Sequence, residues 1–171
     1  MKTKALEALS LAKSIQRDAP INFVPPSEGT KPQNQHVIPH AMVSGTRGYI
    51  EKVVFQINGS YEKGWFDSCA VMMRRLVETL IIECFEADGL DTKIKNSAGE
   101  FYHLSDLISK MLSETSWNLG RDTKKTLPKL KKLGDRSAHN RRYNAHREDI
   151  DKVLADFRLV CQELLYLAHL K

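Results

Sequence analysis

The chain has 171 residues, of which 42% are apolar and 27% are charged. This composition is typical of a globular domain and excludes a chain that is disordered throughout. The length suits one domain with a sizeable core. No apolar stretch reaches the roughly 18 residues that a membrane-spanning helix needs, and the N-terminus lacks the apolar region of a signal peptide. We therefore predict a cytoplasmic protein without membrane association.

Three cysteines, Cys69, Cys84 and Cys161, lie far apart in the sequence and form no CxxC pair. We expect buried, reduced thiols rather than disulfides or metal ligands. The histidines show no metal-ligand spacing, and no glycine-rich phosphate loop is present. The sequence therefore predicts neither a metal site nor a cofactor.

Positive charge is concentrated in one region. The net charge of the chain is +5, yet residues 121–147 contain ten Lys or Arg and two Asp, a local balance of +8 that leaves −3 for the remainder. A basic segment on a mildly acidic body favours a phosphate-bearing partner such as RNA or another nucleic acid. A solvated basic face without a ligand is the alternative.

The first 47 residues differ from the rest of the chain. Leucines at helical spacing predict a short helix over residues 2–17, and five of the six prolines follow between Pro20 and Pro39. Proline lacks a backbone donor and disfavours helix in the residue before it, so an extended arm is expected. The apolar residues expected to hold this arm against the body are Ile21, Phe23, Val24, Val37 and Ile38. We divide the chain into an N-terminal helix and arm, residues 1–47, and a helical bundle, residues 48–171.

The bundle is predicted to be all-α, because its apolar residues recur at i, i+3, i+4 and show no period-two alternation. Helices are expected over residues 48–58, 65–87, 104–112, 126–140 and 148–170. The Asn58-Gly59 pair should stop the first helix. Thr126 should cap the fourth, with Pro128 in its first turn. The second helix is apolar around most of its circumference, Trp65 included, which predicts a central position.

The fourth predicted helix carries a stripe of polar side chains suited to chemistry. At 100° per residue, Lys132, Arg136 and His139 fall on one side, spaced i, i+4, i+7, so they stack along two turns. The cations can neutralise phosphodiester oxygens while the imidazole moves a proton, which makes these three the candidate catalytic residues. Further cations expected to bind nucleic acid are Lys125, Lys129 and Arg142.

Four secondary candidates lie nearby or on the central helix. Arg141 and His146 form a second basic pair just downstream. On the central helix, Glu78 is expected to pair with Arg74 at i, i+4. Arg75 shares a sector with apolar residues, so we expect an ion pair with a carboxylate there; contact with a ligand and extension into solvent are the alternatives.

Four segments together resemble the HEPN superfamily. They read SYEKGWFDSCAVMMRRLVETLIIECFE, LSDLISKML, LPKLKKLGDRSAHNRR and HREDIDKVLADF. The resemblance covers about residues 49–170 and is to an uncharacterised bacterial branch found near defence and restriction genes. It implies an up-and-down helical bundle that forms a homodimer, with the basic helices facing one another across the dimer.

In active HEPN members, an Arg followed four to six residues later by His forms a metal-independent ribonuclease. The resemblance implies that the His assists the 2′-hydroxyl or the leaving oxygen, and that the Arg steadies the phosphate. Arg141 and His146 have such a spacing, whereas the six-residue spacing to His139 starts at Lys132 rather than at an Arg.

Three functions remain open from the sequence. The first is a HEPN-like module that binds RNA or a protein partner in a defence or regulatory system without turnover. The second is a toxin-like, metal-independent endoribonuclease that acts at a dimer cleft. The third is a structural helical dimer whose basic stripe pairs with an acidic partner chain. We rank them in that order.

Overall fold

A computed structural model describes residues 36–171, and all regular elements in that part of the chain are helices. They are α2 (His40–Val43), α3 (Gly48–Glu62), α4 (Phe66–Ala87), the 3₁₀ helix η1 (Asp91–Ile94), α5 (Leu104–Ser113), α6 (Arg121–His139), α7 (Arg147–Asp151) and α8 (Leu154–Leu167). The all-α prediction is confirmed for these residues. The helix predicted over residues 2–17 and the arm residues Ile21, Phe23 and Val24 lie outside the described residues.

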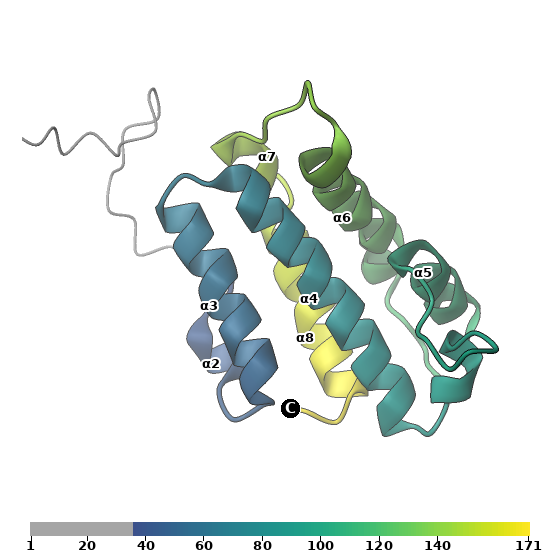
Figure 1. Cartoon of the computed structure of the whole chain (residues 1–171). Coiled ribbons are helices and arrows are strands. Elements are labelled where there is room, and N and C mark those ends of the chain that lie inside the picture. The colour runs from purple at the N-terminus through teal and green to yellow at the C-terminus, as the bar shows by residue number, and fades with distance from the viewer. Residues whose placement is uncertain (1–35) are drawn as a thin grey trace, which may run out of the picture. The chain divides into compact units, whose positions relative to one another are not determined.

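α4 is the central element of the bundle. Figure 1 shows α3, α4 and α6 side by side with α8 behind them, and these four helices run in alternate directions. α4 packs against the other three and against α5. Its apolar circumference explains this position, because side chains on several of its sides, among them Met73 and Phe85, are buried. Trp65, predicted to share that apolar face, is instead 59% exposed and lies just before the first residue of α4.

α3 is longer than predicted. The Asn58-Gly59 pair does not stop the helix, which continues to Glu62. The chain leaves the helix at Gly64, which adopts a φ of +74°, a conformation that glycine reaches without a steric cost. The amides of Gly64 and Trp65 donate to carbonyls of the last turn, and these two bonds form a Schellman motif.

Val37 and Ile38, which lead into the bundle, are held by hydrogen bonds to α3 and to α8. Asn58 of α3 accepts a hydrogen bond from the Ile38 amide at 3.0 Å and donates one to the Ile38 carbonyl at 2.9 Å. From α8, Arg158 Nε donates to the Val37 carbonyl at 2.8 Å. Val37 and Ile38 are fully buried, so the prediction that they lie against the body is confirmed.

α6 begins at Arg121, five residues before the predicted start at Thr126. Its N-terminus is capped by a residue far away in the sequence. Glu163 of α8 accepts a hydrogen bond from the Gly120 amide at 2.6 Å and another from the Thr123 hydroxyl. Because this acceptor lies on another helix, no local capping pattern in the sequence marks the start of α6.

Pro128 lies inside α6, and its predicted place in the first turn is wrong. Proline cannot donate the helical hydrogen bond to the carbonyl four residues earlier, which belongs to Lys124. Both residues are exposed, so water can satisfy this carbonyl.

Gly134 sets the distance between α4 and α6. A Cβ atom at this position would lie 2.5 Å from Arg74 Cβ and 3.1 Å from the Ala70 carbonyl oxygen. The next residue, Asp135, stabilises the same contact between α4 and α6 through ion pairs. One of its oxygens pairs with Arg74 Nε at 2.8 Å, and the other pairs with Lys131. Together these contacts fix which face α6 turns toward solvent.

The helix predicted over residues 148–170 is two helices, α7 and α8. The break falls at Lys152 and Val153. The Val153 amide donates to the carbonyl of Ile150, three residues back, at 3.0 Å, which is the tighter 3₁₀ pattern. The apolar spacing continues through this turn, so periodicity alone does not reveal it.

All three cysteines are buried, unpaired thiols, as predicted. Burial raises the pKa of Cys69 to about 12, and it also raises the pKa values of Cys84 and Cys161. Because the thiolate is the nucleophile, we expect iodoacetamide near neutral pH to leave the native protein unmodified and to alkylate all three in guanidinium chloride. Mass spectrometry of the intact protein measures this, and rapid alkylation of the native protein would contradict the burial.

Candidate nucleic-acid interface

The predicted basic stripe lies on the solvent side of α6. Lys125, Lys129, Lys132 and Arg136 are all exposed. They lie opposite the residues that α6 buries, which are Thr123, Thr126, Leu127, Leu130 and Gly134. The four cations therefore form one continuous face, which no other described helix covers.

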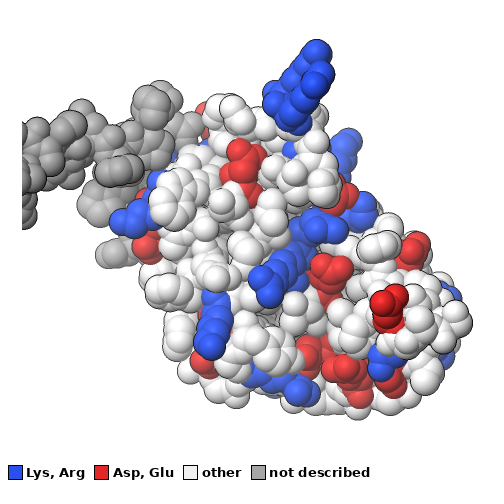
Figure 2. All heavy atoms as spheres, in the orientation of Figure 1, with Lys and Arg blue, Asp and Glu red and all other residues white. Residues whose placement is uncertain are grey.

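Figure 2 shows one face of the molecule in the orientation of Figure 1. Acidic and basic side chains are interspersed over the body in this view, and a basic side chain projects beyond the end at which Figure 1 draws the turn between α6 and α7. Arg141 and Arg142, both exposed, belong to that turn. The turn therefore adds two cations at the C-terminal end of the basic stripe.

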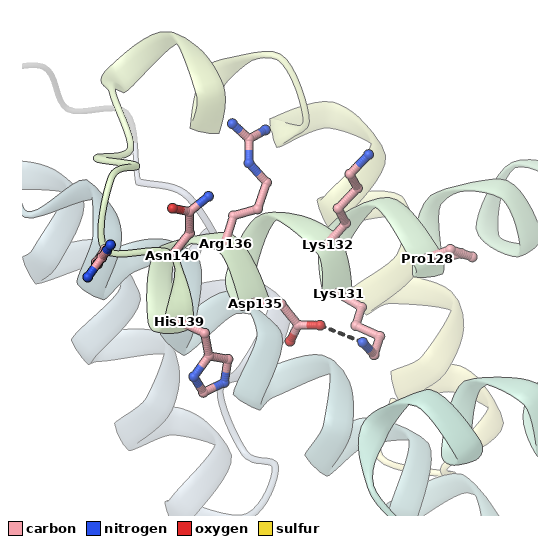
Figure 3. A pocket seen from close by; sticks show the side chains of 8 residues that line it. Pro128, Lys131, Lys132, Asp135, Arg136, His139 and Asn140 are labelled. Carbon is pink, nitrogen blue, oxygen red and sulfur yellow. Dashed lines mark hydrogen bonds and ion pairs between the residues drawn. The ribbon is translucent and has the colours of Figure 1, made fainter.

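Part of the stripe borders a shallow, open hollow of about 650 Å³. The hollow is lined by Pro128, Lys131, Lys132, Asp135, Arg136, His139, Asn140 and Arg141. In Figure 3, Lys132 and Arg136 extend along one rim, whereas the His139 ring turns toward the other rim, where Asp135 and Lys131 lie. The three candidate catalytic residues thus share one hollow, but the imidazole and the two cations point toward different rims.

Arg136 is held in place by an aromatic ring. Its guanidinium carbon lies 3.9 Å from the centroid of the Tyr143 ring, a cation–π contact. Burial raises the pKa of Tyr143, and the neighbouring Asp149 carboxylate raises it further, so the ring stays neutral at physiological pH. One face of the guanidinium covers the ring, which leaves its N–H edge available to a phosphate oxygen. Sequence reasoning missed Tyr143, although it is the single aromatic residue of the basic segment.

Asp135 lies in the hollow without cancelling its positive charge. Its two oxygens are already paired with Arg74 and Lys131. Lys132, Arg136 and Arg141 have no carboxylate partner within residues 36–171. The hollow therefore retains an excess of positive charge that a phosphate group can neutralise.

His139 is exposed at the end of α6. In the described part of the chain, its ring takes part in no hydrogen bond or ion pair. A general acid–base His is normally oriented by a second group that fixes its tautomer. Residues 36–171 supply no such group for His139.

His146 has a structural role at the start of α7. Its side chain accepts a hydrogen bond from the Asp149 amide, and the Asp149 carboxylate accepts one from the His146 amide at 3.0 Å. This reciprocal capping box holds the pKa of Asp149 below its usual value. Arg141 lines the hollow, whereas His146 caps a helix outside it, so the structure assigns the two residues to different places.

The ion pairs predicted for Arg74 with Glu78 and for Arg75 are not found among the described residues, and Arg75 follows the alternative of extension into solvent. Arg75 is exposed and meets no carboxylate among the described residues, because its long side chain reaches solvent. Arg74 turns to Asp135 of α6 rather than to Glu78, since α6 packs along that side of α4. Neither Arg75 nor Glu78 lines the hollow.

Neither a metal-binding cluster nor a membrane-spanning helix is found within residues 36–171. No group of three or more His, Cys, Asp or Glu side chains is placed to hold a metal ion. None of the helices in this range is both long and apolar enough to cross a bilayer.

No protein-family model, curated protein or solved structure matches the chain.

Proposed function

We propose that the protein is an RNA-binding helical module that holds the phosphate backbone along the outer face of α6 without cleaving it. The observation that carries this proposal is the row of exposed cations on one helix face, Lys125, Lys129, Lys132 and Arg136, none of which has a carboxylate partner among the described residues. Proteins bind nucleic acids without sequence preference mainly through such contacts to phosphates.

The position of Arg136 supports the same proposal. A guanidinium already stacked on a ring loses less conformational freedom when it binds a phosphate than a mobile side chain does. Arg141 extends the positive charge around the end of the helix. The all-helical arrangement is consistent with the HEPN resemblance. Our proposal includes that the chain is a member of that superfamily and that it acts in defence or regulation.

The metal-independent ribonuclease is the second candidate, and one observation favours it. His139 borders the same hollow as Lys132 and Arg136, so a phosphodiester bound there would lie within reach of an imidazole. We rank this function lower because the ring turns toward the opposite rim and lacks an orienting partner in the described residues.

The binding test measures the affinity for single-stranded RNA as a function of salt, by fluorescence anisotropy. Neutralising Lys132 and Arg136 together, as Lys132→Gln with Arg136→Gln, should reduce the slope of log K against log salt by about 1.4, at about 0.7 per phosphate contact. The affinity at 0.1 M salt should fall about tenfold or more.

The matched control for the binding test is Lys110→Gln, which removes one exposed charge from α5, outside the stripe. Its slope should equal that of the unaltered protein. Equal slopes for the double variant and the control would contradict RNA binding by α6. Tighter binding to an acidic peptide than to RNA would favour the structural dimer that pairs with an acidic partner.

The same RNA, incubated with the protein and EDTA, tests for cleavage. If the proposal is correct, the RNA stays intact, and His139→Ala binds RNA as tightly as the unaltered protein does. Cleavage that leaves cyclic phosphate ends and is lost in His139→Ala would establish the ribonuclease instead. If the His139→Ala variant still cleaved RNA, His146 would become the candidate catalytic residue.

A further inference from the structure

The outward face of α3 carries an apolar side chain that nothing in the described structure covers. Phe55 is 79% exposed, more than any other large apolar residue in residues 36–171, and Trp65, just beyond the helix, is 59% exposed. Both border an open groove of about 970 Å³ along α3. Exposed aromatic side chains grouped along a groove are typical of a protein–protein interface.

The residues on this face follow the spacing of a coiled coil. Gly48, Lys52, Phe55, Gly59 and Glu62 recur at intervals of four, three, four and three residues, and we call this row the α3 seam. It lies opposite the buried side of α3, which contains Ile50, Val53, Val54, Ile57 and Tyr61. The seam can therefore contact a partner without disturbing the core.

The α3 seam is complementary to itself when a second copy of the helix is laid against it in the opposite direction. If the two-fold axis passes at the level of residue 57, Phe55 of each copy faces Gly59 of the other. A Cβ at Gly59 would meet nothing within 4 Å, so the space above this glycine is open to a phenyl ring. In the same register, Lys52 of each copy faces Glu62 of the other.

A second pair of opposite charges follows from the same register, because Glu51 faces Lys63 of the other copy. Two Lys–Glu pairs at each end and a phenyl ring over a glycine at the centre match in both charge and size. The charges and side-chain sizes along α3 therefore favour a second copy of this chain as the partner.

We propose that two copies of this chain associate through antiparallel packing of their α3 seams. An isologous contact of this kind closes on itself and gives a dimer rather than a filament. α3 has 15 residues and is about 22 Å long, so the helix pair alone buries less than the roughly 1,200 Å² of a standard interface. We expect a dissociation constant in the micromolar range.

This dimer leaves both basic stripes open. Figure 1 shows α4 between α3 and α6, so the helix that makes the proposed contact is not the one that carries the basic stripe. The proposal does not rest on RNA binding by α6. It also differs from the arrangement that the HEPN resemblance implies, in which the basic helices face one another.

Sedimentation equilibrium of the full chain over a range of concentrations tests the dimer. Phe55→Glu should weaken association at least about a hundredfold, because each copy loses a central contact and buries a charge. Tyr166→Glu is the matched control, since Tyr166 is 71% exposed on α8 and does not line the groove along α3, and this variant should dimerise as the unaltered protein does. Equal melting temperatures in dilute solution would show that both variants are folded.

The register has its own test in charge reversal. Lys52→Glu and Glu62→Lys should each weaken the dimer, because they place like charges opposite each other, and the variant with both changes should recover it. A monomer at all concentrations would overturn the proposal. So would a dimer that Phe55→Glu leaves intact, or a double variant that fails to recover.

Discussion

Gly134→Ala is expected to lower the free energy of unfolding by about 2 kcal/mol, although alanine is the better helix former. The intrinsic helix preference favours alanine by about 1 kcal/mol. Against this, the new Cβ would lie 2.5 Å from Arg74 Cβ and 3.1 Å from the Ala70 carbonyl oxygen. The clash involves atoms close to the α4 backbone, so the helices must move apart, and such overpacking costs about 1–3 kcal/mol. At separations this short we expect the upper end of that range, about 3 kcal/mol, which leaves a net loss of about 2 kcal/mol. The melting temperature should fall by about 4–8 °C.

Gly48→Ala is the matched control for this prediction. Gly48 is the first residue of α3, and a Cβ there would meet nothing within 4 Å. Its effect on unfolding, measured by chemical denaturation, should stay within about 0.5 kcal/mol. If Gly134→Ala were as stable as Gly48→Ala, α4 and α6 could not lie as close together as described.

Glu163→Ala should also destabilise the protein by about 2 kcal/mol, through the loss of the cap of α6. The Gly120 amide would lose its acceptor, and the fully buried Thr123 hydroxyl would lose its partner. Loss of a helix cap costs about 0.5–2 kcal/mol, and an unsatisfied buried polar group costs about 1–3 kcal/mol. The carboxylate also lies at the positive end of the helix dipole, which adds to its value.

Two further variants separate these contributions. Glu163→Gln keeps one acceptor oxygen and should lose only about half as much stability. Adding Thr123→Val to Glu163→Ala removes the stranded hydroxyl, so the double variant should be more stable than the sum of the two single changes predicts. Strict additivity would show that Glu163 and Thr123 do not interact, and it would contradict the cap.

Helical periodicity predicted most of the bundle, because burial of one face leaves a clear pattern in the sequence. The stretch around Met73 and Phe85 was correctly predicted as the central helix for this reason. The helix ends were less predictable. α6 starts early because Glu163, on another helix, caps it, and α3 continues past Gly59 because its terminating glycine comes five residues later.

The basic stripe was predictable because a single helix carries it, so the helical angle alone aligns Lys132 with Arg136. The rest of the hollow depends on tertiary structure. Tyr143 reaches Arg136 only because the chain turns back after α6, and Arg74 meets Asp135 only because α4 and α6 pack closely. The side on which the His139 ring lies is a rotamer choice, which sequence spacing does not determine.

The straightness of the basic stripe has a consequence for how RNA would be held. Lys125, Lys129, Lys132 and Arg136 follow one another at steps of about 4.5–6 Å along the axis of α6. A strand displaced by one nucleotide would meet nearly the same row of charges, so its energy would change little. We therefore expect a bound strand to slide along the helix and to exchange registers quickly, with no base sequence preferred.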